Sequence, residues 1–238
     1  MVIRFAPFCV CFVPAAMTLC PEPLAECRSL RGDHDTFFFE REAYCLGYQA
    51  VAGTDEVGRG PLAGPVVAAS VILPTDCEYR QFQDSKKLSP AQRRRLVGVL
   101  GQIGAVVGLG LVSEQEIDRL NILQASLLAM KKSLENLAVQ PDFLLVDGKF
   151  PVPLDLPQRV LIKGDSRSAS IAAASIVAKV ARDELMQHHH DQYPQYAFCK
   201  NMGYPTLAHR QALAQYGPCP LHRRSFRGVK EFFEAGDD

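Results

Sequence analysis

Apolar residues recur along the chain in short runs that are typical of β-strands. Runs at 50–55, 66–73 and 105–112 predict three strands in succession, the first two separated by a turn rich in Gly and Pro. The continuous run 143–146 predicts a strand that is buried on both faces, and 159–163 predicts a fifth strand. Because Gly, Pro, Asp or Ser lie at or just beyond the end of each run, each strand is expected to end in a turn.

Helices are predicted before, between and after these strands. A short amphipathic helix within 37–46 leads into the first strand, and Ser89 followed by Pro90 marks the N-cap and first turn of another helix. Small and apolar residues over 171–185 predict a long helix that packs closely on a sheet. A further helix is predicted over 205–216, where Gly-Pro then ends it.

One long helical stretch is expected between the third and fourth strands. Ser113 and Glu116 have the spacing of a capping box, and apolar side chains then recur every three or four residues from Leu120 to Leu137. The order of elements along the chain is three strands, helices, two strands and helices. This order predicts an α/β fold in which helices flank a mixed β-sheet.

The composition is that of an ordinary globular chain. With 238 residues, of which 47% are hydrophobic and 22% charged, the chain has room for one well-filled domain and an appendage. We predict a poorly ordered extension over 1–36, an α/β domain over 37–198 and a basic helical segment over 199–238 that packs on the same domain.

The first residues raise the question of targeting. The apolar stretch 5–16 resembles the core of a signal peptide, but Pro7 and Pro14 interrupt it and it is too short to span a bilayer. We therefore expect an extension without a membrane partner, in which Met17 is an alternative start.

Cysteine and charge usage narrows the class of protein. The eight cysteines include no C-x-x-C pair, which argues against a zinc ribbon or a redox motif, and scattered thiols fit a reducing cytoplasm. The 26 basic and 26 acidic side chains cancel, so no global field indicates a nucleic-acid partner. Their distribution is uneven, because 192–230 contains several Lys and Arg but no Asp or Glu. This stretch predicts a local basic surface.

The densest chemistry lies between the first two strands. Asp55 and Glu56 are adjacent carboxylates, and the turn Gly58-Arg59-Gly60 follows them. Neighbouring strand residues point to opposite faces, so both acids serve one site only if the chain turns there or a ligand straddles it. Gly58 and Gly60 leave backbone N–H groups open to a phosphate or sugar, and Arg59 offers a planar fork for phosphate oxygens. The alternative is an ordinary surface turn between two strands.

Further carboxylates are expected at the same edge of the sheet. Asp55, Asp147 and Asp165 each end a predicted strand, and ligands of open α/β sheets gather at the carboxyl ends of strands. With Glu56 they concentrate negative charge that divalent cations neutralise, and oxygen ligands select Mg²⁺ or Mn²⁺ over Zn²⁺. We expect no zinc and no organic cofactor. Taken singly, Asp165 is explained as a helix N-cap and Asp147 as part of a turn.

Several runs, in order and with consistent spacing over about residues 38–230, carry a family resemblance. They are AGTDEVGRGPLAGP at 52–65, DSKKLS at 84–89, LVDG at 145–148, KGD at 163–165, SIAAASIVAKV at 170–180 and HRRSF at 222–226. With these runs the chain resembles bacterial ribonuclease HII.

The resemblance implies a ribonuclease H-like fold and hydrolysis of the RNA strand of RNA/DNA hybrids, with nicks 5′ of ribonucleotides embedded in duplex DNA. It also implies two-metal-ion catalysis, 3′-hydroxyl and 5′-phosphate products, and roles in ribonucleotide and RNA primer removal. The family's catalytic and metal-binding carboxylates map onto Asp55, Glu56, Asp147 and Asp165. A monomer is expected, and the sequence does not reveal whether a sliding clamp is a partner.

By the same resemblance, the substrate-binding residues are Gly58, Arg59, Gly60, Tyr204, Lys86 and Lys163. The turn is expected to recognise the 2′-hydroxyl, with Arg59 on an adjacent phosphate and Tyr204 stacked on the following sugar. Lys86 and Lys163 are expected to contact phosphates. Without the resemblance, Tyr204 is explained as a loop residue packed on its own core, and the lysines as solvated side chains.

Some features fit the resemblance less directly. Met202 stands where relatives commonly have Lys, so one positive charge is missing beside the expected substrate. The triplet His188–His190 points in different directions and is expected to be a solvated helix end rather than a metal site. Arg223 and Arg224 either follow the nucleic-acid backbone or brace the C-terminal segment.

Other classes of protein explain less of the chain. Ribonuclease HIII typically has Gly-Lys-Gly in the turn and a large N-terminal substrate-binding domain, and neither feature is found here. A catalytically inactive nucleic-acid-binding module would lose a carboxylate, whereas all four are present. A metal-dependent phosphatase explains the acids but leaves the basic stretch 192–230 without a role.

Overall fold

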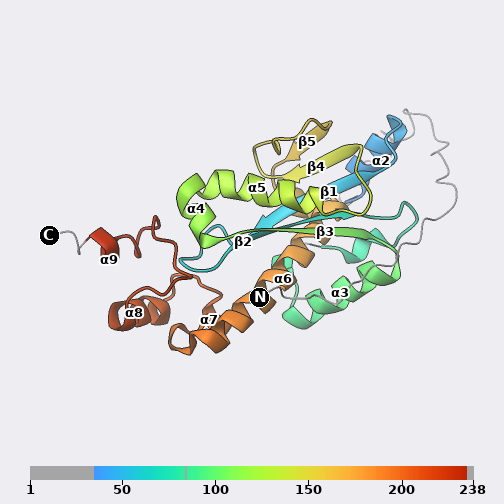
Figure 1. Ribbon diagram of the computed structural model, residues 1–238. Coiled ribbons are helices and arrows are strands. Elements are labelled where there is room, and N and C mark those ends of the chain that lie inside the picture. Colours follow the sequence, from blue (N-terminus) through green and yellow to red (C-terminus); the bar gives the residue numbers. More distant parts are fainter. Residues whose placement is uncertain (1–34, 84, 235–238) are drawn as a thin grey trace.

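A five-stranded mixed sheet forms the centre of the computed structural model, which describes residues 35–83 and 85–234 (Figure 1). The sheet order is β3-β2-β1-β4-β5, with bounds β1 (Val51–Val57), β2 (Val66–Ile72), β3 (Val106–Val112), β4 (Phe143–Asp147) and β5 (Gln158–Leu161). β1, β2 and β3 are antiparallel neighbours, whereas β4 and β5 run parallel to β1. The mixed sheet predicted from the sequence is confirmed. The predictions for 1–34 lie outside the described residues.

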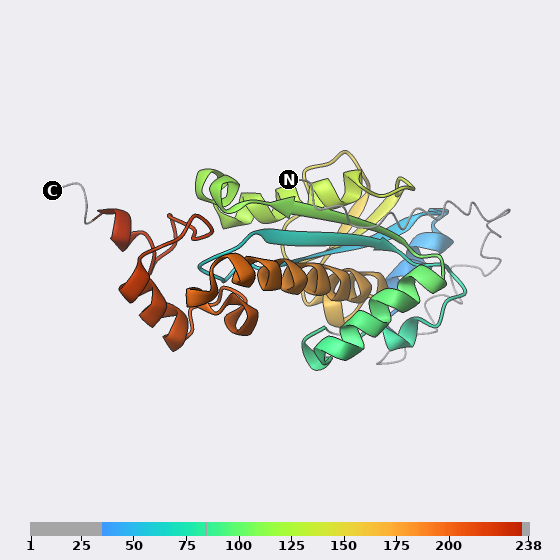
Figure 2. The same ribbon diagram turned by 60° about the horizontal axis from the view of Figure 1, so that its bottom comes forward.

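Helices cover both faces of the sheet, as Figure 2 shows from a second direction. They are α2 (Phe38–Cys45), α3 (Pro90–Gln102), α4 (Glu114–Leu120), α5 (Ile122–Glu135), α6 (Ala169–Gln192), α7 (Phe198–Asn201), α8 (Leu207–Tyr216) and α9 (Glu231–Glu234). Short 3₁₀ turns lie at η1 (Tyr79–Gln81), η2 (Ser85–Lys87), η3 (Gly164–Ser166) and η4 (Pro194–Tyr196). The long helix α6 packs on β1 and β2 with α3 beside it, and α5 packs on the opposite face.

Small residues bring α6 unusually close to the sheet. A Cβ atom at Gly53 of β1 would lie 2.3 Å from the backbone carbon of Ser170, so only glycine fits there. The small side chains of α6, among them Ala172 and Ala173, pack with Ala69 and Val71 of β2 in one buried cluster. The predicted long helix with small residues is therefore confirmed. The close contact between α6 and β1 fixes the distance between the helix and the strand.

The helical stretch predicted over 113–137 is wrong in one respect, because it is two helices. Ser113 caps α4 as expected, accepting the N–H of Glu116 at 3.3 Å. Asn121 then has a φ of 73°, and its side chain accepts the backbone N–H groups of Leu123 and Gln124 as the N-cap of α5. Periodic apolar residues on both sides of Asn121 concealed this break, since asparagine tolerates positive φ and caps helices well.

Two strand ends also differ from the prediction. β1 continues past Asp55 to Val57 because β2 still pairs with it there, with Glu56 opposite Ala68. β5 stops at Leu161, and Lys163 adopts a left-handed conformation with a φ of 55°. Asp55 therefore lies inside a strand, and Asp165 lies in a separate turn beyond one.

The C-terminal segment forms its own small core against the end of α6. Figure 1 shows α7 and α8 gathered at that end. Leu62 and Ala63, which follow β1, are buried in one cluster with Met186 of α6, Phe198 of α7 and Leu213 of α8. The loop after β1 thus rests on residues far along the chain. Within the described residues, no helix combines the length and apolar character that crossing a membrane requires.

Candidate active site

Asp55 and Glu56 lie on opposite faces of β1. Asp55 lies on the α6 face, where it is 6% exposed and within hydrogen-bonding reach of the Ser175 hydroxyl. Its Oδ1 also accepts the backbone N–H of Glu56 at 2.7 Å. Because the strand does not turn between these residues, a ligand must lie across the end of β1 to contact both carboxylates.

Asp147 lies on the neighbouring strand. The parallel pairing of β1 and β4 ends with Thr54 opposite Val146, so the following residues, Asp55 and Asp147, are neighbours at the carboxyl ends of the two strands. Asp147 Oδ1 accepts the backbone N–H of Gly164 at 2.6 Å. Asp147 therefore holds the η3 turn against β4 and is more than part of a local turn.

Asp165 comes from the η3 turn and is buried. It is not the N-cap of α6, because Ser168 has that role and accepts the N–H of Ile171 at 3.2 Å. The Asp165 carboxylate instead faces the η2 loop, where Lys86 Nζ lies 3.1 Å from its Oδ2. The N-cap explanation of Asp165 is therefore wrong, and a carboxylate–lysine pair stands in its place.

The carboxylates perturb one another. Burial, followed by the charges of Glu56 and Asp147, holds the pKa of Asp55 well above its usual value. Burial also raises the pKa of Glu56, opposed by the nearby Arg59, and burial raises the pKa of Asp147, opposed by the Gly164 N–H. Negative charge is therefore unfavourable at the ends of β1 and β4 unless a cation compensates it.

The four carboxylates suit a hard divalent cation, but in the structure their side chains do not converge on one point. Among the described residues, no three His, Cys, Asp or Glu side chains are close enough together to hold one ion. Two of the four carboxylates are turned to protein cations: Asp165 to Lys86, and Glu56 to Arg59 at 3.1 Å. The four acids offer oxygen atoms alone, which suits Mg²⁺ or Mn²⁺ better than Zn²⁺.

The turn Gly58-Arg59-Gly60 follows β1 directly. Gly58 has a φ of 95°, and a Cβ atom there would lie 2.3 Å from Arg182 Nε, so conformation and space both require glycine. The Arg59 side chain is 49% exposed and reaches back to Glu56. The turn thus connects two strands, as an ordinary surface turn would, but it also packs tightly against α6.

Two fully buried arginines support this turn from below. Arg223 donates to the backbone oxygens of Gly58 at 2.6 Å, Arg59 at 3.1 Å and Gly64 at 2.9 Å. Arg182 of α6 donates to the backbone oxygens of Ala63 and Pro65 in the same loop. It also donates to the backbone oxygen of Met202 in the loop 202–206 between α7 and α8, here called the Tyr204 loop. Arg223 therefore braces the fold and has no exposed surface for nucleic acid.

Sequence reasoning missed Arg182 and Ser175. Both lie on the buried face of α6, and a charged or polar side chain at helical spacing among small apolar residues is the signal that would have found them. Ser175 Oγ lies 2.9 Å from Ser85 Oγ and so ties the η2 loop, which carries Lys86, to α6. Arg93 strengthens this connection by donating to the Ser85 oxygen at 3.0 Å.

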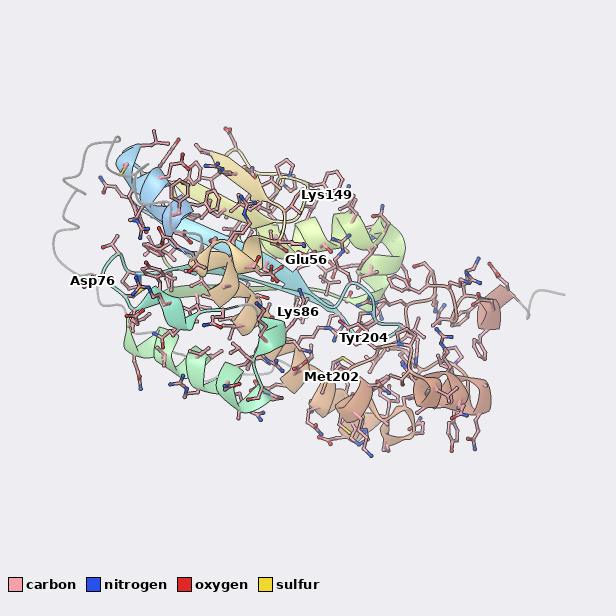
Figure 3. All side chains as sticks on the ribbon, turned by 180° about the vertical axis from the view of Figure 1, so that it is seen from behind. Glu56, Asp76, Lys86, Lys149, Met202 and Tyr204 are labelled. Atoms are coloured by element: carbon pink, nitrogen blue, oxygen red, sulfur yellow. The ribbon has the colours of Figure 1, made fainter. Side chains whose placement is uncertain are left out.

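Tyr204 lies beside the turn and is not part of the core. The residue is 40% exposed, and its Cε1 lies 3.7 Å from the position that a Cβ of Gly60 would take. In Figure 3, Glu56 and Lys86 lie near the end of β1, and Tyr204 lies on the side of them that faces α8. Lys163 is exposed, two residues before Asp165. The structure thus brings the predicted residues to one end of the sheet.

The remaining predicted features have other places. The backbone oxygen of Met202 accepts a hydrogen bond from Arg182 at 3.0 Å, and its side chain packs against the C-terminal cluster. Of the three histidines at the end of α6, His188 is exposed as predicted, whereas His189 and His190 are half-buried. Arg224 donates its backbone N–H to Asp118 at 2.8 Å, and its exposed guanidinium group lies over the Phe233 ring of α9, 4.6 Å from the ring centroid.

Comparisons with known proteins identify relatives of this chain. The family model described as Ribonuclease HII matches residues 52–229. A protein named Ribonuclease HII from Desulfotalea psychrophila is 60% identical over 207 residues, which cover 86% of this chain and 92% of that protein. Another of that name from Chlamydia muridarum is 54% identical over 199 residues, covering 83% of this chain and 91% of that protein.

Solved structures agree on the fold. The ribonuclease H2 from Pyrococcus horikoshii OT3 is similar with a TM-score of 0.67 and 26% sequence identity, over 79% of this chain and 98% of that chain. The predicted ribonuclease H-like fold is thereby confirmed, and so is the resemblance to ribonuclease HII in preference to ribonuclease HIII. The chain therefore belongs to the ribonuclease HII family, a family of nucleic-acid hydrolases with ribonuclease H activity.

Proposed function

We propose that this ribonuclease H nicks duplex DNA on the 5′ side of an embedded ribonucleotide and hydrolyses the RNA strand of RNA/DNA hybrids. The products are a 3′-hydroxyl and a 5′-phosphate. One observation carries the proposal: carboxylates from three segments gather at the end of β1, beside a glycine-flanked arginine turn. The acids suit phosphodiester hydrolysis, and the turn suits a ribose and its phosphate.

Asp55, Glu56, Asp147 and Asp165 would hold two Mg²⁺ or Mn²⁺ ions, which supply activation of water and stabilisation of the leaving 3′ oxygen. The protein prepares the site in their absence. The Gly164 N–H orients Asp147, and the Ser175 hydroxyl orients Asp55. No nucleophilic side chain is needed, because water is the nucleophile.

Two cations of the protein have a further part. Lys86 and Arg59 neutralise Asp165 and Glu56 in the substrate-free protein. We propose that both turn to substrate phosphates once the carboxylates are otherwise neutralised, with Lys163 as an additional contact. Their exposed side chains leave room for such a movement.

The turn recognises the ribonucleotide. The 2′-hydroxyl is the group that distinguishes it from its DNA neighbours. The exposed Gly60 leaves its backbone open to a hydroxyl without steric hindrance from a side chain, while the buried Gly58 gives the turn its shape. Because buried arginines hold the carbonyl groups of this loop, the turn is rigid enough to discriminate one oxygen atom. Tyr204, exposed beside Gly60, stacks on the next sugar.

We also propose that the protein is a monomer that acts in the cytoplasm to remove ribonucleotides and RNA primers from DNA. The cysteines of the described residues, which are Cys45, Cys77, Cys199 and Cys219, are all free thiols. Free thiols fit a reducing compartment.

The proposal is tested on a DNA duplex with one ribonucleotide in the presence of Mg²⁺ or Mn²⁺. Wild-type protein should nick it. Asp55→Asn keeps the shape of the side chain but should lower the rate by more than about 100-fold. Changing a residue that merely supports a metal ligand already costs up to about 100-fold, so changing a ligand should cost more. Asp76→Asn, an exposed carboxylate far from the site in Figure 3, is the matched control and should nick normally. Folded wild-type protein that leaves the duplex intact would refute the proposal.

A further inference from the structure

Two buried histidines contact each other next to the Tyr204 loop. His209 on α8 is 0% exposed, and His222 in the following segment is 2% exposed. Their Nε2 atoms are 3.0 Å apart, which is a hydrogen-bond distance. The rings of Tyr196 and Phe198 pack against them.

The hydrogen-bond partners allow a single arrangement of protons in a neutral pair. His209 Nδ1 lies 2.9 Å from the backbone oxygen of Tyr204, which only accepts, so this nitrogen carries the proton. His209 Nε2 is then the acceptor, and His222 Nε2 must donate to it. His222 Nδ1 also lies 3.3 Å from the Cys219 backbone oxygen, but with the proton on Nε2 it cannot donate there, and it accepts the backbone N–H of Cys219 at 3.0 Å.

Both rings are neutral in this environment. Burial lowers the pKa of His209, and burial together with the neighbouring ring lowers the pKa of His222 to about 4. The charged groups nearest in sequence add positive charge, since Arg223 follows His222 directly. Every ring nitrogen of the pair is therefore used in a hydrogen bond at neutral pH.

The pair ends at the tyrosine that the proposed function places on the substrate. The Tyr204 oxygen accepts from His209 Nδ1 and from the backbone N–H of Thr206 at 2.8 Å. The preceding Gly203 oxygen accepts the N–H of Leu62, also at 2.8 Å, which ties this loop to the one after β1. Tyr204 is thus held from both sides.

The adjacent residue Arg223 contacts the Gly58-Arg59-Gly60 turn. Its guanidinium group bonds to the backbone oxygens of Gly58 and Arg59, while the backbone N–H of Arg223 donates to Leu62 at 2.9 Å. His222 and Arg223 therefore connect, through neighbouring side chains, the Tyr204 loop and the Gly58-Arg59-Gly60 turn.

We propose that His209, held in its Nδ1–H form by His222, is a positioning residue that sets the Tyr204 ring relative to the Gly58-Arg59-Gly60 turn. Ring and turn then contact the ribonucleotide and the following sugar together. This inference rests on the proposed contact of Tyr204 with substrate. The competing explanation is that the pair only fills the core of the C-terminal segment.

A kinetic cycle separates the two explanations. His209→Phe keeps the buried ring and removes both hydrogen bonds. It should raise KM for a duplex with one ribonucleotide about tenfold with kcat nearly unchanged, because substrate contact and not chemistry is disturbed. In a Tyr204→Ala background the same change should alter KM by less than about twofold, since the residue it acts through is gone. An equal rise in KM in both backgrounds, or none in the wild type, would overturn the proposal.

Two conservative variants provide the control for folding. Asn at 209 can keep a donor near the Nδ1 position and so the bond to Tyr204, whereas Gln places its amide near the Nε2 position and keeps only the bond to His222. His209→Asn should return KM to within about threefold of wild type, and His209→Gln should resemble His209→Phe. If KM of all three variants instead follows their Tm, the role is structural and the proposal is wrong.

Nitrogen NMR of the full-length protein gives a test that is independent of activity. The proposal requires His209 to be protonated at Nδ1 and His222 at Nε2 near neutral pH, and His209 protonated at Nε2 would overturn it. A wild-type KM for Tyr204→Ala would also overturn the positioning role, together with the tyrosine contact. Failure of the wild type to nick would instead count against the proposed function, whatever the histidine protonation.

Discussion

Asp55, Glu56 and Asp147 are residues whose buried positions oppose their charge. Burial raises the pKa of each, and neighbouring carboxylates raise it further, so the ionised site is only partly compensated by Arg59 in the protein alone. A metal site is a natural outcome, because binding energy then offsets the repulsion.

The unfavourable burial of these ionised carboxylates predicts that a bound divalent metal ion stabilises the folded protein. Mg²⁺ or Mn²⁺ at about 100 times Kd should add about 2.7 kcal/mol to the free energy of unfolding, a rise in Tm of a few degrees. Asp55→Asn should remove most of the rise, whereas the exposed Asp76→Asn should retain it. Differential scanning calorimetry measures all three, and the same rise in Asp55→Asn as in the wild type would contradict the assignment of Asp55.

Arg59 lies beside Glu56, one of the proposed metal ligands. Its guanidinium group pairs with Glu56 in the substrate-free structure but is half exposed, so we place its main role at a phosphate. Arg59→Ala should weaken substrate binding about tenfold, the loss of a charge-assisted contact, and change metal affinity much less. Arg59→Lys should restore only part of the binding, since an ammonium group lacks the planar fork. Titrations with duplex and with Mn²⁺ compare the two affinities, and an equal loss of both would contradict this role.

At the scale of elements, the closeness of α6 and β1 positions the strand that carries Asp55 and Glu56. Gly53→Ala would place a Cβ 2.3 Å from the Ser170 backbone and should destabilise the protein by about 2 kcal/mol or more, the usual cost of overpacking. Gly98→Ala in α3, where nothing lies within 4 Å of the added atom, should stabilise it by about 0.5–1 kcal/mol. Urea unfolding measures both, and a neutral Gly53→Ala would show that α6 does not set the position of β1.

Periodicity and capping residues predicted most elements because these signals are local. Ser89 caps α3, and the strand runs appear in the expected order. The errors arose where distant contacts or a single residue decided the outcome. β2 extends β1 past Asp55 by pairing, and Asn121 divides a helix inside an unbroken apolar pattern. The pairing of β1 with β2 is not visible in the local sequence pattern, and the unbroken apolar pattern conceals the break at Asn121.

The site was predictable to a similar extent. Carboxylates and glycines carry chemistry that is visible in the chain, so Asp147 and Gly58 could be proposed as site residues before the fold was known. Their support could not, because Arg182 and Arg223 act on backbone oxygens that lie far from them in sequence. Arg223 illustrates the limit: it resembles a nucleic-acid contact in the basic tail, but the structure buries it completely.

At the scale of the whole molecule, segments from the early, middle and late parts of the described chain meet around one site. β1 and β4 supply acids, η3 adds Asp165, and the C-terminal segment holds both the turn after β1 and the Tyr204 loop. The basic stretch 192–230 belongs to this C-terminal segment, which packs against the loop after β1. A local excess of positive charge therefore accompanies the proposed site, although the chain as a whole is neutral.

The most direct measurement is the mapping of cleavage at nucleotide resolution on three matched duplexes in Mn²⁺: DNA with one ribonucleotide, an RNA/DNA hybrid and pure RNA. The account predicts a nick 5′ of the single ribonucleotide with 3′-hydroxyl and 5′-phosphate ends, cleavage of the RNA strand of the hybrid, and little cleavage of pure RNA. Cleavage on the 3′ side of the ribonucleotide, or equal rates on pure RNA, would contradict the claim that the turn beside the carboxylates recognises the ribose.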